Sequence, residues 1–69
     1  MIDRDLLISA CYRKHERLAD LAKFMGIEKE TLSKRITTGS FSRSEIAQIC
    51  SHLDLTKKEK DAIFFSDLR

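Results

Sequence analysis

The chain has 69 residues, of which 42% are hydrophobic and 35% charged, with two glycines and no proline. This composition indicates a compact, mostly helical protein and excludes a disordered one. The length fits a single domain over residues 1–69, with too little chain to build the walls of an enzyme cleft. The net charge of +2 barely favours a polyanion, so the distribution of charge must indicate the partner.

The cysteines and the hydropathy bear on the cellular compartment. Cys11 and Cys50 lie 39 positions apart in two helical patterns, which favours reduced core thiols over a disulfide framework. No segment approaches the ~18 apolar residues of a membrane span, and the first residues lack the apolar run of a signal peptide. We therefore expect a cytoplasmic protein with no membrane partner. Because so short a chain buries only about 60% of its unfolded surface, we also expect a partner protein or a homodimer to add stability.

The first predicted helix covers residues 3–15. Asp3 is its expected N-cap, with a charge that is favourable at the start of a helix. Four apolar residues at helical spacing form the expected buried face: Leu6, Leu7, Ala10 and Cys11. His15 and Glu16 then provide neither a glycine nor a Ser, Thr or Asp cap, so the junction with the next helix is only weakly marked.

Two short helices joined by a tight turn are predicted over residues 18–39. The first carries apolar residues at i, i+3, i+4 and i+7, namely Leu18, Leu21, Ala22 and Met25. Gly26 can adopt the positive φ that a sharp break requires, and the small Ala22 lets the second helix cross the first closely. The apolar seam between the two helices is expected to consist of Leu18, Leu21, Ile27, Leu32 and Ile36.

The second helix of this pair is predicted over residues 28–37. The turn-rich stretch 37–40, TTGS, follows it, and Gly39 is the expected left-handed C′ residue. The next helix begins at Ser42, which forms a capping box with Glu45. A hydrophobic staple of Phe41 and Ile46 accompanies this box. The expected buried face of this helix is Ile46, Ile49, Cys50 and Leu53.

A second capping box, formed by Thr56 with Glu59, starts the last predicted helix, which ends near Phe65. A helix of this length buries only one side, so the neighbouring Phe64 and Phe65 cannot both enter the same core. We expect one of them inside the core and the other at its edge. The alternative is that an exposed phenylalanine forms, with Leu68, a patch that contacts another protein or a second copy of the chain.

Five short helices, with a tight turn between the second and the third, resemble the Cro and phage-repressor family. The residues that carry the helix-turn-helix resemblance are Ala22, Gly26, Ile27, Leu32 and Ile36. The pattern F-S-x-x-E-I at 41–46 and the closing pair Phe64 and Phe65 are similar to those of small prophage regulators. The resemblance implies an all-α, compact five-helix bundle of the lambda repressor-like type. It also implies a transcriptional regulator of a lysogeny switch in a bacterial host cell.

The resemblance places the helix over residues 28–37 in the major groove of operator DNA. Its expected base readers are Glu28, Lys29, Glu30, Ser33 and Lys34. In these positions lysines donate to guanine O6 or N7, a glutamate accepts from cytosine N4, and a serine does either. The expected phosphate contacts are Lys23, Thr37, Thr38, Ser40 and Arg43. Each of these charges is also typical of an ordinary solvated helix surface.

Glu28 and Glu30 depart from the family's pattern, which commonly has Gln, Ser or Thr at the start of this helix. A groove lined by phosphates repels carboxylates, although both residues favour the helix dipole. An acidic face on this fold can instead dock on the basic DNA-binding surface of a cognate phage repressor, with Glu28, Glu30, Phe65 and Leu68 as the expected contacts. The alternative function is therefore an antirepressor, or modulator of repression.

Metal binding and catalysis find little support. Two cysteines and two histidines, namely Cys11, His15, Cys50 and His52, supply the four atoms of a zinc site. However, Cys50 and His52 are two apart on a helix and point in different directions, and no C-x-x-C occurs. The chain also lacks a Gly-rich phosphate loop and a nucleophile elbow. We expect no metal, no cofactor and no enzyme activity.

Overall fold

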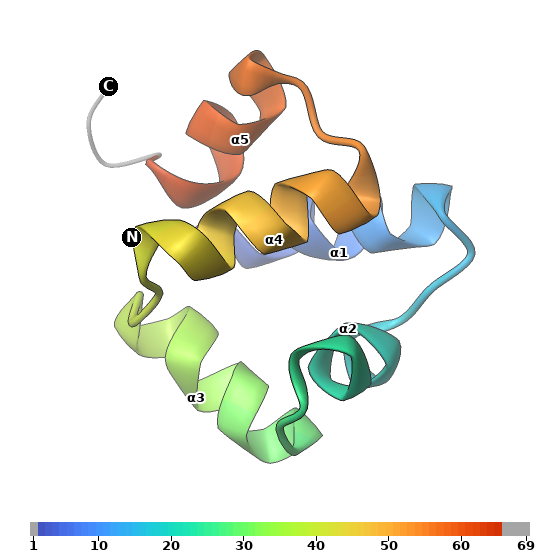
Figure 1. The fold of residues 1–69 in the computed structure, drawn as a ribbon, viewed down its shortest axis with the longest axis vertical. Helices are drawn as coiled ribbons and strands as arrows, with labels where there is room; N and C mark the ends of the chain where they lie inside the picture. The colour runs from blue at the N-terminus through green and yellow to red at the C-terminus, as the bar shows by residue number, and fades with distance from the viewer. Residues whose placement is uncertain (1, 66–69) are drawn as a thin grey trace.

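The computed structural model describes residues 2–65, which form five α-helices and no strand. The helices are α1 Arg4–Arg13, α2 Leu18–Met25, α3 Lys29–Thr38, α4 Arg43–Leu53 and α5 Lys57–Phe64. In Figure 1, α4 crosses the centre of the molecule in front of α1, with α5 above them and α2 and α3 below. The radius of gyration, 10.8 Å, is close to the ~11 Å of a compact chain of this length. The predicted all-α, compact fold of five helices is confirmed.

One apolar cluster holds the helices together. Every helix contributes a side chain that is 3% exposed or less, namely Leu7, Leu21, Leu32, Ile49 and Ile63. No polar or charged side chain is buried within residues 2–65, so the core is held by apolar packing alone. None of the helices in this part of the chain has the length and apolarity needed to cross a membrane.

The break between α2 and α3 occurs at Gly26, as predicted. Gly26 has a φ of 74° and ends α2 in the left-handed conformation. Its amide donates to the Lys23 carbonyl at 3.1 Å, and the Ile27 amide donates to the Ala22 carbonyl at 3.0 Å. These two hydrogen bonds form a Schellman motif, which turns the chain sharply at the end of a helix. Ala22 is 1% exposed, and α2 and α3 approach each other closely.

Both predicted capping boxes are present. The Ser42 hydroxyl accepts from the Glu45 amide at 3.1 Å, and the Glu45 carboxylate accepts from the Ser42 amide at 2.9 Å. Thr56 and Glu59 exchange the same pair of hydrogen bonds, at 3.1 and 3.0 Å. Because each box satisfies two backbone donors at a helix start, α4 and α5 begin where the sequence predicts.

The end of α1 differs from the prediction. The helix stops at Arg13 and does not reach His15. His15 adopts a left-handed φ of 59°, and the Glu16 amide closes the turn by donating to the Cys11 carbonyl at 3.0 Å. His15 thus occupies the left-handed position after α1 that Gly26 occupies after α2. Because a histidine fills this position, no glycine in the sequence marks the end of α1.

The position of Leu6 also differs from the prediction. Leu6 was expected on the buried face of α1, but its side chain is 42% exposed. The buried stripe of the helix runs through Leu7, Ala10 and Cys11, all 3% exposed or less. Leu6 lies beside this stripe, at the rim of a shallow groove between α1 and α5 that also includes Ala62. The core therefore takes three of the four predicted residues of α1.

Small differences concern the bounds of α3 and α5. Glu28 has extended backbone and occupies the N-cap position, so α3 starts at Lys29 and continues through Thr38. The helix α5 ends at Phe64, which is 5% exposed and lies in the core. Phe65 is half-buried and packs at the edge of the core. The expectation that one phenylalanine is inside and its neighbour at the edge is confirmed.

Candidate nucleic-acid interface

The helix α3 has one apolar and one polar side. Leu32 and Ile36 are 2% exposed or less and belong to the core. The opposite side carries the exposed residues Glu30, Lys34 and Thr37, and the exposed Lys29 lies at the start of the helix, where it lines a hollow with Arg4 and Arg17. In Figure 1, α3 lies at the lower left edge of the molecule. A helix that is anchored by two apolar residues and polar on its outer side can meet a partner along its length.

Two basic residues away from this side of α3 are engaged in ion pairs. Arg13 pairs with Glu59, and Lys14 with Asp54. Six exposed basic residues of α1, α2, α3 and the start of α4 make no ion pair with a carboxylate of residues 2–65, namely Arg4, Arg17, Lys23, Lys29, Lys34 and Arg43. On α5 the exposed Lys57 and Lys58 and the half-buried Lys60 also make no ion pair with a carboxylate of residues 2–65. The cations around α3 thus have no carboxylate partner among the residues that the structure describes.

Two cations outside the predicted site, Arg4 and Arg17, lie next to α3. Arg4 of α1, Arg17 before α2 and Lys29 of α3 line one hollow, together with apolar side chains that include Leu18. Arg4 Nη2 donates to Ser33 Oγ at 3.1 Å, across 29 positions of sequence. No local pattern signals such a contact, because it depends on how α1 packs beside α3.

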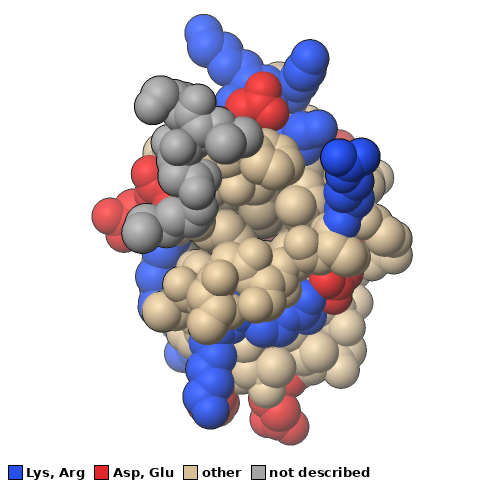
Figure 2. Space-filling view, turned by 90° about the vertical axis from the view of Figure 1, so that its left-hand side faces the viewer, with Lys and Arg blue, Asp and Glu red and all other residues tan. Residues whose placement is uncertain are grey.

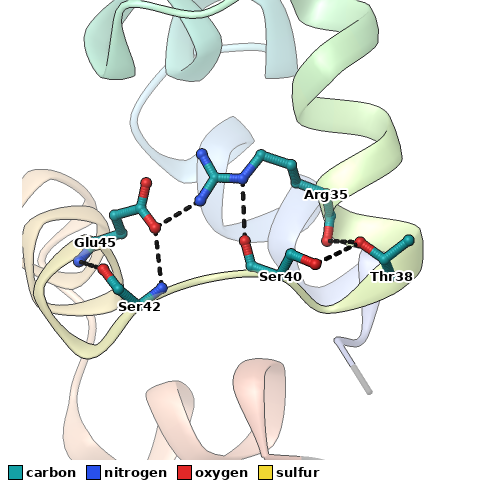
Figure 3. A network of polar contacts seen from close by, with 5 residues as sticks. All are labelled: Arg35, Thr38, Ser40, Ser42 and Glu45. Carbon is teal, nitrogen blue, oxygen red and sulfur yellow. Dashed lines mark hydrogen bonds and ion pairs between the residues drawn. The ribbon is translucent and has the colours of Figure 1, made fainter.

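The hydroxyl groups at the C-terminal end of α3 are already engaged. Thr37 and Thr38 donate to the carbonyls of Ser33 and Lys34, both at 3.1 Å. Ser40 Oγ lies 2.9 Å from Thr38 Oγ1, as Figure 3 shows. The stretch 37–40 was expected to be a turn, but Thr37 and Thr38 form the last turn of α3. Because their hydrogens are donated within the helix, these two hydroxyls must rotate before they can donate to a phosphate.

Arg35 connects α3 to α4 (Figure 3). Its Nη2 lies 2.5 Å from Glu45 Oε1, and its Nε donates to the Ser40 carbonyl at 3.0 Å. The guanidinium carbon also lies 4.7 Å from the centre of the Phe41 ring. The hydrogen bond from Arg35, together with that from the Ser42 amide, lowers the pKa of Glu45 to about 2. Arg35 therefore fixes the junction between the two helices and is not a free cation.

The other predicted phosphate contacts border the two ends of α3. Arg43 is exposed and is the first residue of α4, just after the junction that follows α3. Lys23 is exposed in the last turn of α2, just before the turn that leads into α3. Phosphate contacts on both flanks of a helix position it in a groove, whereas its central side chains reach the bases.

The predicted protein-contact residues are only partly accessible. Glu28 and Glu30 are exposed and make no ion pair within residues 2–65. Phe65 is half-buried at the core edge, and Leu68 lies outside the described residues.

Figure 2 faces the left-hand side of Figure 1 and shows a broad uncharged area with Lys, Arg, Asp and Glu around it. This side of the molecule is therefore mixed in charge and not uniformly basic.

Both cysteines and His52 are engaged in the core or in contacts with other side chains. Cys11 is fully buried and Cys50 half-buried, and both are free thiols. Burial, assisted by the nearby Glu16 carboxylate, raises the pKa of Cys11 to about 11. His52 Nε2 lies 2.9 Å from Glu16 Oε1, and its ring stacks on Phe24 with centres 4.0 Å apart. Over residues 2–65, no three potential metal ligands come together.

Comparisons with protein-family models, with curated proteins and with solved structures find no match for this chain. Its function is therefore inferred from its own residues and their geometry. The features that bear on function are the polar side of α3, the cations on either side of it, and the two carboxylates at its start.

Proposed function

We propose that this chain is a phage-type transcriptional regulator that binds operator DNA through a helix-turn-helix made of α2 and α3, as a lambda repressor-like domain does. The observation that carries the proposal is the placement of α3. Leu32 and Ile36 anchor it in the core, Gly26 sets it at an angle to α2, and its other side is polar and exposed. A helix of this kind fits the major groove, which is about 12 Å wide.

Roles for individual residues follow from this placement. Lys29, at the start of α3, and Lys34, in its middle, are exposed and can donate to guanine O6 or N7, while Glu30 can accept from cytosine N4. Lys23 and Arg43 lie at the two ends of α3 and hold phosphates of the adjoining strands. In this proposal two copies of the chain bind the two halves of an operator.

The carboxylates at the start of α3 favour a second candidate function. Glu28 and Glu30 flank Lys29, are exposed, and make no ion pair within residues 2–65. A phosphate-lined groove repels both, whereas the basic DNA-binding surface of a cognate repressor attracts them. The chain would then act as an antirepressor, occupying the surface with which the repressor binds its operator.

One mobility-shift experiment tests both functions. DNA flanking the gene for this chain is mixed with the chain alone, with the repressor of the same switch alone, and with both. Direct binding predicts a shift by the chain alone that weakens steeply with salt. It also predicts weaker binding by Lys34→Ala and Arg43→Ala, by several-fold each, and unchanged binding by Lys58→Ala, a control on the distant α5.

Antirepression predicts a different outcome of the same experiment. The chain alone then gives no shift at low salt, which contradicts direct binding, and it removes the shift caused by the repressor. The double charge reversal Glu28→Lys and Glu30→Lys abolishes this effect, whereas it strengthens the salt-sensitive, sequence-independent part of any direct binding to DNA, because two charges that phosphates repel become attractive. The sign of that change separates the two functions.

A further inference from the structure

The guanidinium of Arg4 reaches the middle of α3 from outside the α2–α3 pair. Arg4 is the first residue of α1, and its Nη2 donates to Ser33 Oγ at 3.1 Å. Ser33 is one helical turn after Lys29 and one turn before Thr37, and it lies on the same side of α3 as both. Arg4 and the polar side of α3 therefore form one continuous surface.

We propose that Arg4 is a specificity-determining residue that reads a guanine in the bound DNA and that Ser33 holds it in position. This inference depends on the proposed DNA-binding function. A guanidinium carries five N–H donors in a fixed planar fork. The bond to Ser33 uses one donor, and those that remain suffice for the paired contact with guanine O6 and N7.

The position of Arg4 favours a base edge over a phosphate. Phosphates lie along the two sides of the groove, whereas a group fixed to the middle of α3 lies above its floor. Arg4 makes no ion pair with a carboxylate of residues 2–65. Arg17 lines the same hollow from the start of α2, beside α3, and serves as the phosphate-contact comparison.

Ser33 gives Arg4 a defined place before DNA arrives. A long arginine side chain loses rotamer freedom when it binds, and a hydrogen bond that is already formed reduces this loss. Ser33 is half-buried and accepts this bond through its hydroxyl oxygen. Ser33, which the sequence resemblance places among the base readers, is thus a positioning residue for an arginine of another helix.

Selection of binding sites from a library of random DNA duplexes tests the inference. The wild-type chain is compared with Arg4→Ala, Arg4→Lys, Ser33→Ala and the control Arg17→Ala, and each variant is then titrated with the selected duplex and with duplexes changed at single positions. Arg4→Ala is expected to lose the preference for guanine at one position, about tenfold in relative affinity. Arg4→Lys keeps the charge but loses most of the preference, and Ser33→Ala weakens it partly. Arg17→Ala lowers affinity for all sequences alike and reduces the salt slope by about 1.

The possible outcomes separate the inference from the function on which it depends. If the wild-type chain selects no sequence, DNA binding is wrong and the inference falls with it. If the wild type selects a site and Arg4→Ala weakens all duplexes equally, Arg4 contacts a phosphate and only the inference is overturned. Circular dichroism melting verifies that each variant is folded, and Arg4→Lys serves as the deciding variant should Arg4→Ala fail to fold.

Discussion

At the scale of single residues, Glu45 stabilises the fold in two ways, as a helix cap and as the partner of an arginine. Its carboxylate accepts from the Ser42 amide in the capping box of α4 and from the Arg35 guanidinium of α3. Both contacts favour the ionised carboxylate, which lowers its pKa from 4.5 to about 2. The pKa of Asp54 is lowered in the same direction by Lys14, and that of Glu59 by the Thr56 amide and Arg13. Three carboxylates on the surface therefore bind protons less readily in the folded chain.

Acid is expected to weaken the fold through these groups. A carboxylate with a depressed pKa contributes its full stabilisation above its unfolded pKa and loses it as the pH falls towards its folded pKa. For Glu45 this window runs from 4.5 down to about 2. Glu45→Gln keeps the shape of the capping box but removes the charge that pairs with Arg35. Urea unfolding should show a lower midpoint for this variant at pH 7 and a smaller difference from the wild type at pH 3.

A control variant makes the acid prediction specific. Glu30→Gln removes an exposed carboxylate that makes no ion pair within residues 2–65 and only a weak interaction with the helix dipole, so its urea midpoint at pH 7 should fall much less than that of Glu45→Gln. An equal deficit of Glu45→Gln at pH 7 and pH 3 would show that the charge of Glu45 does not act as described.

At the scale of elements, the first four helices end with the same backbone feature. A left-handed residue follows or caps the end of each of the first four helices, namely His15, Gly26, Gly39 and Asp54. Each turns the chain so that the next helix can pack against the core. Two of the four are glycines, which adopt this conformation without steric cost, and the other two are residue types that occur there less often.

Gly26→Ala tests how much the break between α2 and α3 depends on backbone conformation. No atom lies within 4 Å of the position that a Cβ would occupy at Gly26, so the cost comes from the positive φ alone. We expect a loss of about 1 kcal/mol in unfolding free energy and a fall in melting temperature of about 4–8 °C. Gly26→Asn should cost less, because asparagine tolerates the left-handed conformation better. Equal melting temperatures for the alanine variant and the wild type would contradict this account.

At the scale of the whole molecule, stability depends on one small core. The five helices share a single cluster of buried side chains with no buried polar residue among residues 2–65. A core of this size rarely supplies more than about 3–5 kcal/mol. Each large buried side chain is therefore a substantial part of the total free energy of unfolding, and we expect the helices to unfold cooperatively, as small single domains usually do.

Leu32→Ala is expected to remove most of the stability of the chain. Leu32 is 0% exposed, and truncation of a buried leucine to alanine costs about 2–5 kcal/mol. Leu6→Ala is the matched control, because Leu6 is 42% exposed and should cost less than about 1 kcal/mol. Thermal melting followed by circular dichroism checks both variants. Similar melting temperatures for the two variants would show that burial of Leu32 does not make the expected contribution to the stability of the fold.

Local chemistry explains what could be predicted from the sequence. The capping boxes at Ser42 and Thr56, the break at Gly26 and the inward residues of α3 and α4 all arise from groups a few positions apart. Such groups interact in any chain that forms the helix, so their pattern alone determines the result. The prediction failed at His15, which takes the left-handed conformation although no glycine signals a helix end there.

Only the tertiary structure decided which charged side chains form ion pairs and which distant side chains come into contact. Arg35 and Arg43 look alike in the sequence, yet Arg35 is bound to Glu45 and Arg43 makes no ion pair within residues 2–65. The contact of Arg4 with Ser33 spans 29 positions. The sequence by itself determined the helices, their caps and their apolar sides, because these depend on short-range hydrogen bonds and periodicity. The composition of the candidate interface depends on the packing of distant helices, and only the folded chain determines that.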